Sequence, residues 1–118
     1  MEITRAYVKS ILPHRDPEGH KGTFGKVYCL CGAVGYTGAP VLAASAAVRS
    51  GSGLVFLGVP KDIWPIVAVK CDSAMPSPLP SQQGKLALAA EDAVRQVRAY
   101  DQRQRTIVVK SCAPAPLW

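Results

Sequence analysis

The stretch KVYCLCGAVGYTGAPVLAASAAVRSGSGLVFLGVP, residues 26–60, decides the fold class of this chain. Two short apolar runs within it, 26–33 and 54–60, lack polar alternation, which is typical of strands covered on both faces. Residues 38–51 lie between the two runs and predict a helix. Two strands joined by a helix and short turns predict a parallel sheet with right-handed crossovers, as in α/β folds.

The helix expected at 38–51 has clear ends and an unusually apolar middle. Pro40 fits a first helical turn and Gly51 fits a helix stop. The residues between them are almost all Ala, Val and Leu, and Arg49 is the only charged one. We therefore expect this helix to be buried on more than one side.

The flanking segments continue the alternation of helices and strands. Residues 4–12 predict a short helix that Thr4 caps, and 61–71 predict another with Asp62 as its N-cap. The other expected elements are a polar loop at 13–25, an extended segment at 73–80, a loop at 81–85, an amphipathic helix at 86–97 and a short strand at 107–109.

Composition and charge exclude several classes of protein. The chain has 118 residues, of which 48% are hydrophobic and 19% charged, a globular composition that suits one domain or a piece of one. The longest mostly apolar stretch, 39–48, is about half the roughly 20 residues that a helix needs to cross a membrane. The first 13 residues carry charges and no apolar signal core, so we expect a cytoplasmic location.

The net charge of +6 is unevenly distributed. Residues 1–94 hold nine Lys/Arg against seven Asp/Glu, whereas 95–118 hold five against one. Because a nucleic-acid-binding face needs basic residues clustered on the folded body, we expect no nucleic-acid partner. The alternative is a nucleic-acid binder that uses the arginines of the last segment: Arg95, Arg98, Arg103 and Arg105.

The spacing of the cysteines and histidines does not indicate a metal site or a catalytic site. Cys29 and Cys31 are two apart and would share one face of a strand, with neither a CxxC nor a His pair at metal-ligand spacing nearby. We interpret the four cysteines as buried small hydrophobes and expect no metal site. His14 and His20 share the polar loop without a nucleophile and a third member, so we expect no catalytic histidine.

Two glycine-rich segments are candidates for ligand binding. HKGTFGKV at 20–27 fails as a phosphate loop because His20 replaces the first glycine, Val27 replaces Ser/Thr, and a strand follows it where a helix should. GAVGYTGAP at 32–40 is better placed, since ligands of open parallel sheets bind at the carboxyl ends of strands. The backbone amides of Gly38 and Ala39 would face that position, although such a turn also serves chain topology alone.

Three motif blocks resemble one enzyme family. These are RDPEGHKGTFGKV at 15–27, GAVGYTGAPVLAASAAVRSGSGLV at 32–55 and VPKDIWPIV at 59–67, and their order and spacing resemble the opening of the ADP-dependent NAD(P)H-hydrate dehydratases. The resemblance covers about 3–96. It implies a partial, truncated ribokinase-like fold, a three-layer α/β/α structure with a mostly parallel sheet. We expect residues 1–96 to be the N-terminal part of such a domain and 97–118 to be a divergent basic, Pro-rich tail.

The resemblance also implies a function. The family restores NADH or NADPH from the hydrated cofactor, using ADP and Mg²⁺ to activate and then eliminate the added hydroxyl. By resemblance, Ala39 contacts the NAD(P)H hydrate, Gly38 and Thr37 of the same turn support it, and Lys21 is a further contact. The partner would be this small-molecule nucleotide, not a nucleic acid or a membrane, and the family is expected to be homo-oligomeric.

The departures from the family determine what this chain is expected to do. The family's Gly-Thr-Gly-Asp motif, which holds the transferred phosphoryl group and supplies an acid/base aspartate, does not occur in the sequence. RAYDQRQR at 98–105 stands where a Gly-rich segment is expected, as after a frameshift. We therefore expect no catalytic residue, no dehydratase activity of the chain alone, and poor solubility or self-association from an incomplete sheet. The alternatives are a non-catalytic nucleotide- or partner-binding α/β module and a fragment of another ribokinase-like kinase.

Overall fold

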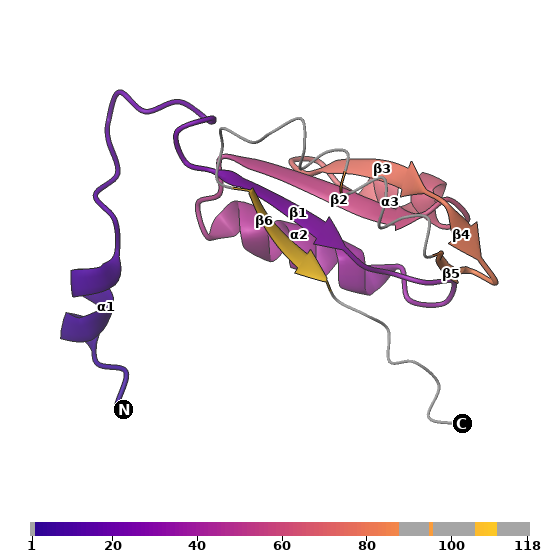
Figure 1. Cartoon of the computed structure of the whole chain (residues 1–118), viewed down its shortest axis with the longest axis horizontal. Helices are drawn as coiled ribbons and strands as arrows, with labels where there is room; N and C mark the ends of the chain where they lie inside the picture. The colour runs from indigo at the N-terminus through magenta and orange to yellow at the C-terminus, as the bar shows by residue number, and fades with distance from the viewer. Residues whose placement is uncertain (1, 88–94, 96–105, 111–118) are drawn as a thin grey trace.

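The structure is a computed structural model, and it describes residues 2–87, 95 and 106–110 (Figure 1). Its elements, in chain order, are α1 (Arg5–Ile11), β1 (Lys26–Leu30), α2 (Gly38–Arg49), β2 (Leu54–Pro60), α3 (Trp64–Lys70), β3 (Met75–Leu79), β4 (Ser81–Gln82), β5 (Lys85–Leu86) and β6 (Thr106–Lys110).

The main sheet has four strands in the order β3-β2-β1-β6, and all three pairings are parallel. The prediction of a parallel α/β sheet is therefore confirmed. The register of β1 and β2 runs from Lys26 opposite Leu54 to Leu30 opposite Gly58. The strand expected at 107–109 is present as β6, so part of the segment 97–118 pairs directly with β1.

The main core lies between the sheet and the two helices α2 and α3, which pack on the same face (Figure 1). Alternate residues of β1 and β2 point toward these helices, as the pleat of a strand requires. The buried residues of this cluster are Cys29, Cys31, Ala44, Val55, Leu57, Val59, Ile63 and Val67. The opposite face carries a smaller cluster, in which the Tyr28 and Phe56 rings stack with their centroids 6.0 Å apart.

Burial in this core suppresses the ionisation of the cysteines. Cys29 and Cys31 are unpaired and buried, as the sequence predicts. Cys71 is unpaired but only partly buried, so the prediction of burial is wrong for it, and Cys112 lies outside the described residues. Burial raises the pKa of the Cys29 thiol. Burial, followed by the charge of Cys29, raises the pKa of Cys31 to about 11. Both groups are therefore neutral apolar side chains at physiological pH.

The segment before β1 is fixed against the turn between α2 and β2. Gly53 donates its backbone N–H to the Phe24 carbonyl over 3.3 Å, and Leu54 donates to the Gly25 carbonyl over 3.1 Å. The Arg15 guanidinium donates to the Gly51 carbonyl over 3.1 Å and stacks 3.9 Å above the centre of the Phe24 ring. The HKGTFG segment is thus a structural turn at the amino edge of the sheet.

Two prolines in the edge strand β3 hinder the addition of a further strand at this side of the sheet. In β3, the backbone groups of Pro76 and Pro78 face away from β2, because Leu79 is one of the alternate residues that bond to β2. Neither proline has an N–H to offer, and the Pro76 carbonyl accepts a hydrogen bond from the Trp64 indole over 3.1 Å. These features discourage the pairing of a further strand with β3.

Four expectations about the elements need correction. Helix α2 begins and ends almost as predicted, but only Pro40 and Ala44 of it are buried, and Leu42 is 72% exposed, because α2 faces core on one side only. Asp62 does not cap α3; the N-cap is Ile63, and the Asp62 carboxylate instead accepts a hydrogen bond from Ser81.

The expected loop at 81–85 is a hairpin, and Leu86 belongs to its strand β5. The helix predicted over 86–97 therefore does not begin at Leu86, and most of its range lies outside the described residues. The N-terminal helix is confirmed as α1, where the Tyr7 amide donates to Thr4 Oγ1 over 3.2 Å. None of its residues is buried, and Figure 1 shows it standing apart from the sheet.

We predict that Gly53→Ala destabilises the fold while Gly38→Ala does not. A Cβ at Gly53 would collide with the Lys21 carbonyl and lie 2.8 Å from its carbon, whereas a Cβ at Gly38 meets nothing within 4 Å. We expect a loss of about 2–3 kcal/mol for the first variant and a change within about 0.5 kcal/mol for the second. Thermal unfolding checks this, since the first loss lowers Tm by roughly 10 °C; equal Tm values would contradict the packing described.

We further predict that stability falls in alkaline solution because of the buried thiols. Their pKa values in the folded chain are raised, so the stabilisation is complete below the unfolded value of 9.0 and is lost as pH rises toward about 11 for Cys31. Each thiol contributes a slope of up to about 1.4 kcal/mol per pH unit in that window. Urea unfolding across this window measures the slope, and Cys31→Ala should reduce it; an unchanged slope would count against the burial of Cys31.

Candidate functional site

The candidate site is the turn that leaves β1 at the carboxyl edge of the sheet and enters α2, residues 32–39, which we call the ligand turn. Parallel pairing brings this turn beside the one that leaves β2. Gly32 lies where the two turns meet. Its φ is +98°, and a Cβ at this position would lie 2.8 Å from Ile63 Cδ1 and 3.1 Å from Pro40 Cγ. Only glycine fits this position without strain. The start of α2 is thereby packed against the residue that caps α3.

The start of α2 presents backbone donors to solvent. Gly38 and Ala39 are exposed, and Thr37 occupies the N-cap position without making a side-chain cap. The first amides of a helix have no partner within the helix, and Pro40 supplies none. The Gly38 and Ala39 amides therefore belong to exposed residues at the positive end of the α2 dipole. They can donate to a phosphate or an amide oxygen of a ligand.

The β4–β5 hairpin lies beside this turn, and sequence reasoning missed it. The Val34 amide donates to the Gly84 carbonyl over 2.8 Å, and Ala33 forms an antiparallel bridge with Lys85. Both central residues of the hairpin turn have positive φ, 51° at Gln83 and 72° at Gly84, which matches a two-residue hairpin turn. The only indication in the sequence was this Gln-Gly pair between two short segments.

The remaining candidate residues are not brought to this edge. The Lys21 carbonyl lies against Gly53, at the amino end of β1, so Lys21 is separated from Thr37, Gly38 and Ala39 by the length of the strand. The HKGTFG loop enters β1 and the ligand turn leaves it, so the two segments lie at opposite ends of this strand. His20 is structural, since its Nδ1 accepts the Gly22 amide over 3.0 Å.

The described residues contain no group of three or more His, Cys, Asp or Glu that could hold a metal ion.

In the same part of the chain, no helix is long and apolar enough to cross a membrane. Of the arginines considered for nucleic-acid binding, Arg95 is exposed and the other three lie outside the described residues.

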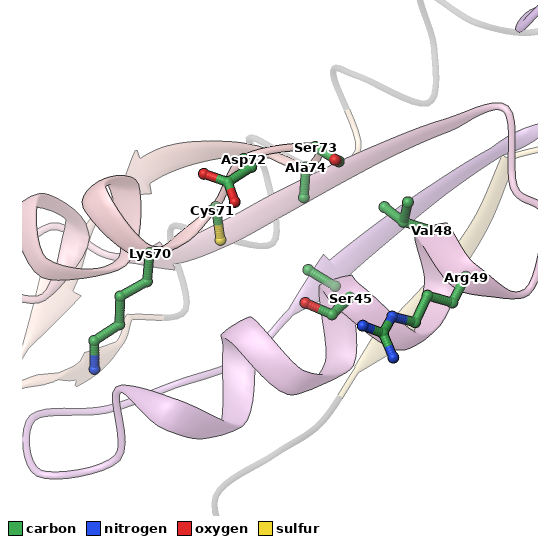
Figure 2. A pocket seen from close by; sticks show the side chains of 9 residues that line it. Ser45, Val48, Arg49, Lys70, Cys71, Asp72, Ser73 and Ala74 are labelled. Atoms are coloured by element: carbon green, nitrogen blue, oxygen red, sulfur yellow. The ribbon is translucent and has the colours of Figure 1, made fainter.

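A cavity of about 200 Å³ lies elsewhere, between α2 and the connection from α3 to β3 (Figure 2). This cavity is at the amino edge of the sheet, away from the ligand turn. Its lining includes Arg49, Lys70 and Asp72. In Figure 2 the Lys70 side chain extends downward at the left, whereas the Arg49 guanidinium lies at the right, beyond Ser45, so the two cations do not converge on one ligand position.

The sequence profile of one protein family, described as NAD(P)H-hydrate dehydratase, matches residues 27–101. The bifunctional NAD(P)H-hydrate repair enzyme Nnr of Moorella thermoacetica is 44% identical over 78 residues, which are 66% of this chain and 15% of that protein. The ADP-dependent (S)-NAD(P)H-hydrate dehydratase of Bacillus subtilis is 39% identical over 64 residues, 54% of this chain and 23% of that protein. The chain thus spans less than a quarter of the length of either relative.

Solved structures agree on the fold. The ADP/ATP-dependent NAD(P)H-hydrate dehydratase of Bacillus subtilis, co-crystallised with ATP/Mg²⁺, superposes with a TM-score of 0.58 at 33% identity, covering 69% of this chain and 28% of that one. A ribokinase-like superfamily protein of Enterococcus faecalis has a TM-score of 0.62 at 20% identity, covering 87% of this chain and 42% of that one.

The profile match covers well over half of the 118 residues and includes the turn with Gly38 and Ala39. The fold that carries this turn is shared with the solved dehydratase and with the ribokinase-like protein. The chain therefore belongs to the NAD(P)H-hydrate dehydratase family and has a ribokinase-like α/β fold.

Proposed function

We propose that this chain provides the nicotinamide-nucleotide half-site of a cytoplasmic ADP-dependent (S)-NAD(P)H-hydrate dehydratase. The observation that carries the proposal is the pair of uncapped, exposed amides at Gly38 and Ala39, at the carboxyl edge where open parallel sheets bind ligands. Relatives matched over this region are named as enzymes that act on NAD(P)H hydrate. The ligand is thus the hydrated nicotinamide nucleotide.

Each part of the turn has a role in this binding. The Gly38 and Ala39 amides donate to an oxygen of the nucleotide, and the α2 dipole favours a negative charge there. Because neither residue carries a side chain beyond Cβ, the nucleotide can approach the backbone closely. Thr37 borders the same position, since its backbone leads directly into the helix. Lys21 takes no part within one copy of the chain.

The groups for ADP and Mg²⁺ do not fit the described residues. These residues hold no carboxylate cluster for a divalent cation, and the Gly-Thr-Gly-Asp motif is absent from the whole sequence. We therefore assign this chain binding and orientation of the hydrate, and no step of phosphoryl transfer. ATP/Mg²⁺ is what the Bacillus subtilis dehydratase was crystallised with.

We predict that the full chain binds NADPH weakly and that Ala39→Glu weakens this binding further without loss of stability. A glutamate at the second position of α2 stabilises the helix dipole by about 0.3–1 kcal/mol but repels the nucleotide phosphates. Calorimetric titration should give a Kd of roughly 0.1–1 mM for the wild type, near −5 kcal/mol. The matched neutral variant, Ala39→Gln, should bind at least about threefold more tightly than Ala39→Glu.

An Ala39→Glu variant that binds NADPH like the wild type would rule out this turn as the binding position. A wild type that gives no saturable heat at roughly 1 mM NADPH would rule out the half-site itself. Thermal unfolding of all three proteins is the control, because a lowered Tm in Ala39→Glu would mean that unfolding could account for the loss of NADPH binding.

We also predict that the chain alone does not dehydrate the hydrate. Positioning without a phosphoryl cradle and an acid/base group leaves out the terms that lower the barrier most. The measurement is the appearance of NADH absorbance after mixing the chain with NADH hydrate, ADP and Mg²⁺, with a full-length dehydratase as the positive control. Turnover above that of a mock preparation would contradict this prediction, because it would show that this chain catalyses the dehydration.

A further inference from the structure

We propose that the β4–β5 hairpin is a positioning element that holds the ligand turn in its binding shape, with Gly84 as the residue on which it depends. This inference rests on the proposed function, because the turn that it holds carries the Gly38 and Ala39 amides. The hairpin itself contributes no contact to the ligand in this proposal.

The first anchor of the hairpin is on the ligand turn. The Gly84 carbonyl accepts a hydrogen bond from the Val34 amide over 2.8 Å, and Lys85 forms an antiparallel bridge with Ala33. The hairpin therefore pairs with the backbone just after β1. A Cβ on Gly84 would lie 2.7 Å from Val34 Cγ2 and 2.9 Å from Val34 Cβ. The two backbones therefore approach as closely as they do only because residue 84 is glycine.

The second anchor is on the neighbouring turn, which leaves β2. The Ser81 hydroxyl donates to the Asp62 carboxylate, and the Lys61 amide donates to the Leu79 carbonyl over 3.0 Å, just before the hairpin. The hairpin is thus fixed at its base to the β2–α3 turn and at its tip to the β1–α2 turn. A two-residue turn gives it little freedom to bend between the two anchors.

The ligand turn depends on this support because its internal hydrogen bond, from the Tyr36 amide to the Ala33 carbonyl over 2.9 Å, leaves the side chains of its tip unpacked. Val34, Gly35 and Tyr36 are exposed, and Thr37 makes no side-chain cap on α2. Without the Val34–Gly84 bond, the turn would have to be ordered by the ligand at the cost of affinity. A site supported by surrounding contacts binds more tightly than one that is ordered on binding.

The test compares Gly84→Ala with Gly51→Ala in the full chain. Both glycines have positive φ, 72° and 96°, and an added Cβ at each lies within 2.7 Å of another side chain, but Gly51 is at the amino edge. We expect Gly84→Ala to raise the Kd for NADPH by at least about fivefold and Gly51→Ala by less than about twofold. Equal effects of the two variants would overturn the proposal.

A second readout needs no ligand. Backbone ¹⁵N relaxation should give order parameters near 0.85 for Tyr36 to Ala39 in the wild type and in Gly51→Ala, and below about 0.6 in Gly84→Ala. If wild-type chain binds no NADPH, the proposed function fails, and these order parameters alone decide the role of the hairpin. Unchanged values in Gly84→Ala would overturn it.

If Gly84→Ala does not fold, Ser81→Ala replaces it. This variant removes the hydrogen bond to Asp62, and Ser50→Ala is its match, since Ser50 Oγ donates to the Ala47 carbonyl over 2.9 Å at the amino edge. Ser81→Ala should raise the Kd for NADPH by at least about threefold and lower the order parameters of the ligand turn. Matching results from the two serine variants would overturn the proposal.

Discussion

The parallel pairing of β1 with β2 is the constraint on which the rest of this structure depends. Because the strands run in the same direction, both βα turns lie at one edge and both strand starts lie at the other. The crossover helix α2 must then cover one face, and its apolar side packs on Val55, Leu57 and Val59. The positions of the ligand turn, the hairpin and the HKGTFG segment all follow from this arrangement.

The two edges of the sheet use glycine for different purposes. At the amino edge, Gly53 lets the chain before β1 pack directly on the α2–β2 turn, and Arg15 fixes the contact. At the carboxyl edge, Gly38 has open space around it and Gly84 brings the hairpin against Val34. Closed packing at one edge gives stability, whereas the other edge carries the exposed start of α2, where the proposed half-site lies.

Much of the fold was predictable because its core strands and α2 are decided by local pattern. The unbroken apolar runs predicted β1 and β2, and the rule that ligands bind at strand ends made Gly38 and Ala39 candidates, which the structure places at that edge. Long-range contacts were not predictable in the same way. Asp62 looks like a helix cap in the sequence, yet it bonds to Ser81, nineteen residues later.

The hairpin escaped prediction for a related reason. Its strands have two residues each, too short for any periodicity, and Gln83 is an unusual residue at positive φ. What stabilises it is contact with the two βα turns, which only the folded sheet brings together. Lys21 lies at the other end of β1 from Gly38 and Ala39, because its loop enters the strand that their turn leaves.

Ligand binding and catalysis can be separated in this family if the shape of the ligand turn is fixed by contacts with residues nearby in the sequence. The contacts that fix the turn involve Gly32, Ala33, Val34, Tyr36, Pro40, Ile63, Gly84 and Lys85. All of these residues lie within two consecutive βα units and the hairpin that follows them. None of these contacts involves a Gly-Thr-Gly-Asp motif, which the sequence does not contain. A chain that spans 15% of the length of one relative and 23% of another can therefore keep the shape of this turn, on which the proposed half-site rests, because the contacts that build it are close together in the sequence.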